Sequence, residues 1–178
     1  MSLIERLEGR RLMSVSISTS PDGSVLMVRN AANVSVTEFD VGSARQVSVV
    51  DNSNPAGPTG VTLTGNFQTL VIIGTNGNDQ ILLNTFDLNA IIDGGNGSDF
   101  ITAFIGSTAT APGTAKVLIA GGNGDDFITV DGSTNSPFTV QEQGTFYVDG
   151  GNGDDVIQIL DPINVVVIPS RGTDTVIG

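Results

Sequence analysis

The stretch GGNGDDFIT, residues 121–129, places three glycines and two aspartates in six residues and then continues as an apolar run. Similar stretches occur at four other places: GTNGNDQIL (74–82), GGNGSDFIT (94–102), GGNGDDVIQ (150–158) and the degenerate PSRGTDTVI (169–177). Glycine adopts backbone angles that other residues avoid, so each copy predicts a tight turn. The chain therefore makes one kind of turn repeatedly, and each turn ends on a carboxylate.

An apolar, β-branched or aromatic run precedes each of these turns. Such runs suit a pleated, buried strand better than a helix interior. Two further runs, ending at Val28 and Val50, extend the rhythm upstream, so that strand ends recur at steps of 19 to 29 residues. The runs before the glycine turns are TLVII (69–73), NAII (89–92), KVLI (116–119), TFYV (145–148) and NVVVI (164–168).

A strand that recurs at this interval, with turns and a second short strand between, indicates a repeat architecture. We predict an all-β chain folded as a right-handed parallel β-solenoid (a β-roll or β-helix) of about seven coils. The longer steps place loop insertions near 103–115 and 131–144. An antiparallel β-sandwich is the alternative fold, but it predicts hairpin loops of about two to five residues and no register between distant turns.

The predicted organisation is one solenoid over residues 15–178, without the glycine motif at 15–70 and with it at 71–178. Residues 1–14 form a predicted leader or targeting-like segment. Its stretch LEGRRLMS (7–14) resembles the LEPR-x-LL motif at the front of large extracellular proteins, notably of planctomycete bacteria. Gly9 stands where that motif has proline, and Met13 stands where it has leucine.

The charge is strongly negative and concentrated after residue 73. The chain has 19 acidic and 7 basic residues, a net charge of −12, and residues 74–178 account for −11 of it. Nucleic acid is excluded as a partner, because its binding depends on lysine and arginine releasing counterions. Cysteine and histidine do not occur, which excludes disulfides, zinc–thiolate sites and histidine-based catalysis. No apolar run has the length of a transmembrane helix, so membrane insertion is not expected.

The repeated turn suits a hard cation. Calcium takes about six to eight oxygen ligands from carboxylates and peptide carbonyls. One turn offers too few of them, but two turns stacked at the strand spacing of about 4.8 Å can share one ion. Ile128, two residues after Asp126, is expected to point into the core and to anchor the loop.

The three stretches GGNGSDFIT, GGNGDDFIT and GGNGDDVIQ resemble the hemolysin-type (repeats-in-toxin) calcium-binding nonapeptide G-G-x-G-x-D-x-U-x at every defined position. GTNGNDQIL departs at Thr75, and PSRGTDTVI keeps only Gly172, Asp174 and Val176. The resemblance implies a β-roll with one ladder of about three to four calcium ions. It implies carboxylate ligands and completing loop carbonyls from Gly74, Asn76, Asp79, Gly94, Asn96, Asp99, Gly121, Asn123, Asp126, Gly150, Asn152, Asp155 and Asp174.

Asp125 and Asp154 occupy a variable position of the motif and are expected to face solvent. Alternation along the strands predicts outward apolar rows at Val71, Ile91, Leu118, Tyr147 and Val166, and at Phe100, Phe127 and Val156. Such rows suit cover by the chain itself, self-association, or contact with a cell surface or polysaccharide.

The function expected from the sequence is a non-catalytic, secreted or cell-surface calcium-binding module whose ions drive folding. A calcium-stabilised adhesive or polysaccharide-binding solenoid is the alternative. A polysaccharide-processing enzyme is less favoured, because the best-placed aspartates are committed as ligands.

Overall fold

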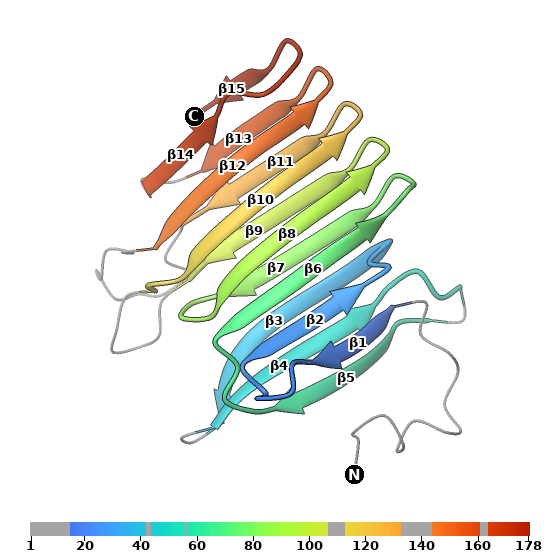
Figure 1. Ribbon diagram of the computed structural model, residues 1–178, viewed down its shortest axis with the longest axis vertical. Helices are drawn as coiled ribbons and strands as arrows, with labels where there is room; N and C mark the ends of the chain where they lie inside the picture. The colour runs from blue at the N-terminus through green and yellow to red at the C-terminus, as the bar shows by residue number, and fades with distance from the viewer. Residues whose placement is uncertain (1–14, 42–43, 56, 107–112, 133–143, 161–163) are drawn as a thin grey trace.

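The computed structural model describes residues 15–41, 44–55, 57–106, 113–132, 144–160 and 164–178. These residues form fifteen strands in two sheets and contain no helix, which confirms the predicted all-β class (Figure 1). The predicted leader at 1–14, with its LEGRRLMS stretch, lies outside the described residues. So do residues 107–112 and 133–143, the central parts of the two predicted insertions.

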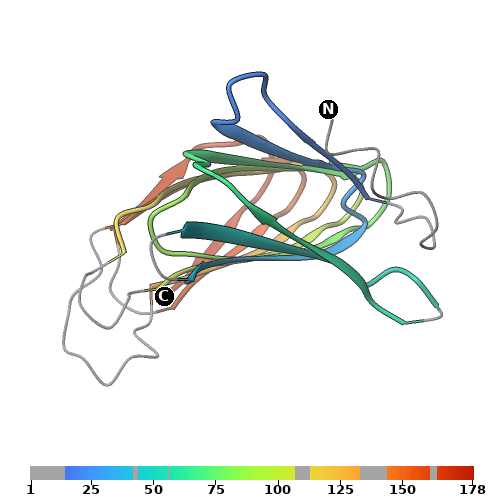
Figure 2. The ribbon, with the colours of Figure 1, turned by 90° about the horizontal axis from the view of Figure 1, so that it is seen from below.

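The two sheets face each other across the core (Figure 2). The seven-stranded sheet has the order β1 (Ser16–Thr19), β2 (Val25–Arg29), β6 (Thr69–Thr75), β8 (Asn89–Asn96), β10 (Lys116–Asn123), β12 (Thr145–Asn152) and β14 (Asn164–Ile168). The eight-stranded sheet has the order β15 (Thr175–Ile177), β13 (Val156–Leu160), β11 (Phe127–Asp131), β9 (Phe100–Ile105), β7 (Gln80–Thr85), β3 (Asn33–Val41), β4 (Ala44–Asp51) and β5 (Thr59–Thr64).

From β6 onward, successive strands alternate between the two sheets and pair in parallel with the strand of the next repeat. The register holds across long sequence separations, since Ile119 pairs with Ile92 on one side and with Val148 on the other. Asn123 likewise pairs with Asn96 and Asn152. The glycine turns therefore stack in register on one edge, as their spacing predicts, and the hairpin-linked sandwich is not the arrangement of this part of the chain.

The first part of the described chain departs from the predicted all-parallel array. β1 pairs antiparallel with β2, and β3, β4 and β5 form an antiparallel meander, so both sheets are mixed. The run ending at Val50 belongs to β4 of the eight-stranded sheet and does not repeat the position of Val28. The 22-residue interval between the strand ends at Val28 and Val50 therefore comes from the antiparallel pairing of β4 with β3, and not from a coil of the parallel series. Among the described residues, the parallel series contains six strands in each sheet. The prediction was about seven coils.

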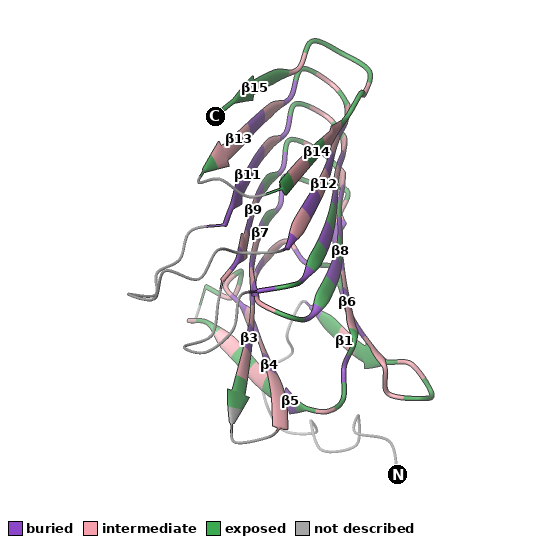
Figure 3. Ribbon diagram, turned by 90° about the vertical axis from the view of Figure 1, so that its left-hand side faces the viewer, coloured by how far each residue is buried: buried purple, intermediate pink, exposed green. Residues whose placement is uncertain are grey.

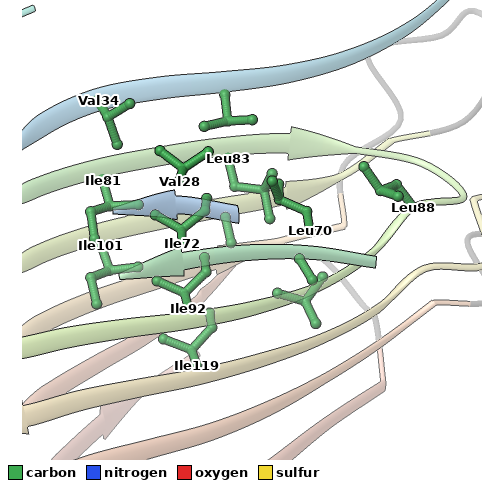
Figure 4. Close-up of a cluster of buried hydrophobic side chains, with 14 of the residues drawn as sticks. Val28, Val34, Leu70, Ile72, Ile81, Leu83, Leu88, Ile92, Ile101 and Ile119 are labelled. Carbon is green, nitrogen blue, oxygen red and sulfur yellow. The ribbon is translucent and has the colours of Figure 1, made fainter. Parts of the chain in front are cut away.

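The core lies between the sheets and is filled by the inward residue of every second strand position (Figure 3). Ile72, Ile92 and Ile119 stack along one sheet, and Ile81 and Ile101 stack along the other (Figure 4). All five are at most 2% exposed. The predicted anchor, Ile128, is fully buried. Two-residue alternation thus places one apolar set inside, and burying such side chains is the main force that holds the sheets together.

The predicted outward apolar rows are confirmed as outward. Ile91, Leu118 and Val166 are each more than 40% exposed on the seven-stranded sheet, and they lie in one register row with the half-buried Val71 and Tyr147. On the other sheet, the rings of Phe100 and Phe127 stack with centroids 5.2 Å apart and an interplanar angle of 3°.

The buried carboxylate of Glu38 joins the antiparallel part of the fold to the repeats. Glu38 of β3 is 5% exposed, and its Oε1 lies 2.9 Å from Nε of Arg45 on β4. Its Oε2 accepts hydrogen bonds from the hydroxyl of Thr85 and from the backbone N–H groups of residues 86, 87 and 88. One carboxylate therefore holds the turn between β7 and β8, at the edge of the sheets opposite the glycine turns.

Candidate metal centre

All three glycines of each central turn provide space, since a Cβ on Gly122 would also stand 2.1 Å from the carbonyl oxygen of Gly95, and the second and third glycines provide a backbone conformation as well. A Cβ on Gly121 would stand 2.2 Å from Oδ2 of Asp126 and 2.4 Å from the carbonyl oxygen of Gly150. Gly121 has no positive φ, whereas Gly122 and Gly124 have φ values of 117° and 121°. The same division holds in the turns at 94–99 and 150–155. The sequence pattern indicated only the conformational role, because steric space depends on the neighbouring coil.

The motif aspartates point inward and connect one turn to the next. Oδ1 of Asp99 accepts the backbone N–H of Asp79 at 2.8 Å, and Oδ1 of Asp126 accepts that of Asp99 at 2.7 Å. Oδ1 of Asp155 accepts the N–H of Asp126 at 2.8 Å, and Oδ1 of Asp174 accepts that of Asp155 at 3.4 Å. One oxygen of each carboxylate from Asp99 onward is thus used by a backbone bond to the preceding turn.

The second oxygen is without a partner in the three central turns. Oδ2 of Asp99, Asp126 and Asp155 is buried and accepts no hydrogen bond, and these residues are at most 2% exposed. An ionised oxygen without a partner in such a place is costly, since a buried charge needs a compensating group. The three positions therefore demand either a cation or a proton.

Carbonyl oxygens lie beside two of these carboxylates. Oδ2 of Asp99 and the carbonyl oxygen of Gly121 both lie within 2.4 Å of the point where a Gly94 Cβ would stand. Oδ2 of Asp126 and the carbonyl oxygen of Gly150 make the same arrangement around Gly121. Each pair combines oxygens from two adjacent turns. This is the donor set that calcium prefers, and only glycine leaves room for it.

The predicted asparagine positions form a second ladder on the outside of the turns. The side-chain amide of Asn96 donates to Oδ1 of Asn76, that of Asn123 to Asn96, and that of Asn152 to Asn123, at 2.7–2.8 Å. The carbonyl oxygens of Asn123 and Asn152 also accept the N–H groups of Gly97 and Gly124. These residues are thus engaged in turn-to-turn hydrogen bonds, a role that the motif alone did not indicate.

Asp125 and Asp154 are exposed, as predicted. Oδ1 of Asp125 accepts the N–H of Asp154, and Oδ1 of Asp154 accepts the N–H of Thr173. Asn78 makes the equivalent bond to the N–H of Ser98. An amide oxygen therefore serves as well as a carboxylate at this position. The five turns carry Asn, Ser, Asp, Asp and Thr at this position, and this variation was the sequence signal that no charge is required there.

The described residues contain no group of three or more acidic side chains that could hold a metal ion. A cation at these turns would therefore depend on one or two carboxylates together with peptide carbonyls. The partnerless buried oxygens, the space that a Cβ would fill and the purely oxygen donor set fit calcium.

The electrostatics of the three central aspartates follow from their position. Burial, together with the charges of Asp79 and Asp93, raises the pKa of Asp99 to about 6, against the lowering effect of the Asp79 N–H. Burial and three neighbouring aspartates likewise raise the pKa of Asp126 to about 6. The pKa of Asp155 is also raised, again chiefly by burial. Each shift reflects the cost of a negative charge that has no partner.

In metal-free buffer, we expect the melting temperature to rise as the pH falls from 7.5 toward 5. The folded-state pKa of Asp99 and Asp126 is about 6, whereas the ordinary value is 3.8. A raised folded-state pKa makes protonation stabilise the fold, fully so below about pH 4, and this contribution is lost as the pH rises through about 6. Thermal melts followed by circular dichroism at several pH values measure it.

In saturating calcium this trend should disappear or reverse, because protons then compete with the cation for the same oxygens. A melting temperature in metal-free buffer that falls steadily from pH 7.5 to 5 would contradict the assignment of these carboxylates as buried and partnerless.

Comparisons with protein-family models, with curated proteins and with solved structures each returned no significant match. Within the described residues, no helix is long and apolar enough to cross a membrane. The assignment of this edge therefore rests on its residues and their geometry.

Proposed function

We propose that the chain is a calcium-binding module of the β-roll type. In this proposal the two sheets are the faces of a right-handed parallel β-solenoid, closed at its first coils by the antiparallel strands. The observation that carries the proposal is the row of three partnerless, buried Oδ2 atoms of Asp99, Asp126 and Asp155 on one edge. Two of these atoms lie beside a glycine carbonyl of the following turn.

Calcium bound there would supply the positive charge that the buried carboxylates lack. Asp99 and Asp126 would each contribute Oδ2, and Gly121 and Gly150 would contribute carbonyl oxygens from the next turn. Bridging two turns in this way adds to the backbone bonds that the Oδ1 atoms already accept. Because the site exists only when adjacent turns stack, the free energy of binding becomes free energy of folding.

The charge distribution supports the same function. Residues 74–178 carry a net charge of −11, and without cations this part of the chain repels itself. We infer a non-catalytic, structural role outside the cell, at a cell surface or in a secreted assembly, where calcium is abundant. The inward aspartates bond to neighbouring turns, so their oxygens serve cohesion between coils and not acid–base chemistry.

The test is a calcium titration of thermal stability, with magnesium as the comparison ion. Extracellular calcium modules bind at roughly 10⁻⁴–10⁻³ M, so millimolar calcium, at about 1 to 10 times the dissociation constant, stabilises by about 0.4–1.4 kcal/mol per site. We expect millimolar calcium to raise the melting temperature by several degrees or more and chelator to reverse it. Magnesium should substitute poorly, because it is smaller and demands octahedral geometry.

Two variants at adjacent residues distinguish a carboxylate that binds calcium directly from one that acts only through its long-range charge. Asp126→Asn removes the buried charge and should weaken the calcium response clearly. Asp125→Asn loses the same charge one residue away but keeps its hydrogen bond, as Asn78 shows, so it should change the response only slightly. A calcium response that is absent in the wild-type chain, or equal mild effects of the two variants, would refute the proposed site.

A further inference from the structure

The five turns differ at their second position. Gly95, Gly122 and Gly151 occupy it in the three central turns, whereas Thr75 and Ser170 occupy it in the first and last turns. The three glycines have positive φ values of 106°, 117° and 106°. Thr75 and Ser170 are not among the residues with positive φ, so the backbone of the two end turns follows a different path.

This difference decides whether the carboxylate of the turn has a partner. In the first turn, the hydroxyl of Thr75 donates to Oδ1 of Asp79 at 2.7 Å, and the Thr75 N–H donates to Oδ2 at 2.5 Å. In the last turn, the hydroxyl of Ser170 donates to Oδ2 of Asp174. Both carboxylates are thereby satisfied from within their own turn.

The three central turns have neither donor. Glycine carries no hydroxyl group, and Oδ2 of Asp99, Asp126 and Asp155 accepts no hydrogen bond from any group. The N–H groups of Gly95, Gly122 and Gly151 do not donate to these oxygens either. Chemically similar motif copies thus divide into two classes, satisfied at the ends and unsatisfied in the middle.

We propose that Thr75 and Ser170 are intramolecular caps that end the cation ladder, so that the chain binds three calcium ions, one at each central turn. This inference rests on the proposed function and narrows it, since Asp79 and Asp174 then serve as hydrogen-bonded end pieces and not as calcium ligands. The hydroxyl and amide hydrogens beside these carboxylates carry positive charge, so they compensate the negative charge that would otherwise attract a cation.

The arrangement has a physical advantage at the ends of the stack. Among the described residues no glycine turn follows the one that ends at Asp174, so a cation there would have no carbonyl ligand from a following turn. At the first turn the carbonyl oxygen of Gly94 does lie near Oδ2 of Asp79, but that Oδ2 already accepts the N–H of Thr75. A hydroxyl donor satisfies the carboxylate without a following turn. The two ends are therefore held by hydrogen bonds in the absence of calcium, while the middle depends on ions.

The decisive experiment measures the number of calcium ions that the chain binds at saturating calcium, by equilibrium dialysis and by native mass spectrometry. The wild-type chain should bind three ions. Thr75→Gly removes the hydroxyl and permits positive φ, so it should bind four, with Asp79 and the carbonyl oxygen of Gly94 joining the ladder. Thr75→Ser keeps the hydroxyl and should still bind three.

A second variant keeps the inference testable if Thr75→Gly folds poorly. Asp79→Asn should retain three ions, whereas Asp126→Asn should lose at least one. Four or five ions in the wild-type chain, an unchanged count of three in folded Thr75→Gly, or loss of an ion in Asp79→Asn would each overturn the inference. No calcium binding by the wild-type chain would instead overturn the proposed function itself.

Discussion

Replacing Gly121 by alanine is expected to destabilise the fold by about 3 kcal/mol, the upper end of the usual range for overpacking, and to disrupt the calcium site at the Asp126 turn. The added methyl group would stand 2.2 Å from Oδ2 of Asp126 and 2.4 Å from the carbonyl oxygen of Gly150. Neither neighbour can move freely, because Asp126 also bonds to the N–H of Asp99 and Gly150 belongs to the next strand. The same oxygens are those assigned to calcium.

Thermal unfolding with and without calcium measures both effects. For a chain of this size, about 1 kcal/mol corresponds to about 2–4 °C in melting temperature. Gly106→Ala is the matched control, since Gly106 has no positive φ and a Cβ there would meet no atom within 4 Å. Gly106→Ala should melt close to the wild type. Equal melting temperatures and calcium responses for the two variants would show that the space at Gly121 is not required.

Glu38→Ala is expected to cost about 3 kcal/mol, the lower end of the range found when one partner of a buried ion pair is removed, because Glu38 is buried but Arg45 is 26% exposed. The change leaves three consecutive backbone N–H groups without their acceptor, while the Thr85 hydroxyl still has the carbonyl oxygen of Leu88. It also leaves Arg45 without its carboxylate, although Nη1 of Arg45 still donates to the carbonyl oxygen of Phe67. The turn between β7 and β8 would therefore lose the side-chain link to β3 that these bonds provide.

Chemical denaturation in saturating calcium measures the free energy of unfolding that the variant loses while its calcium sites stay occupied. Glu38→Gln keeps an acceptor oxygen for the turn and should cost less than the alanine variant. Asp40→Ala, on the same strand but exposed, should change stability by no more than about 0.5 kcal/mol. A Glu38→Ala chain as stable as Asp40→Ala would mean that the carboxylate does not support the turn.

Much of the repeat region could be predicted from residue order. The alternation in β6, β8, β10 and β12 marked the buried set, because a strand sends successive side chains to opposite faces. The glycine–aspartate motif located the turns, and their stacking in register followed from the parallel pairing. The antiparallel pairing of β1, β4 and β5 was missed, because a run such as RQVSVV suits either strand direction and its own residues do not specify which neighbour it pairs with.

The sequence by itself determined the all-β class, the inward and outward rows of the repeats and the place of an aspartate in every turn, since these depend on local periodicity and backbone preference. Only the tertiary structure decided which aspartate oxygens have partners. Asp79 and Asp126 occupy the same motif position, yet one is bonded by Thr75 and the other has a free, buried Oδ2. The tertiary structure also decided that Gly121 is needed for space and that Glu38 holds a turn nearly fifty residues away. The physical reason is that hydrogen bonding, burial and steric space depend on atoms brought together by the stacking of coils, which local sequence preferences do not specify.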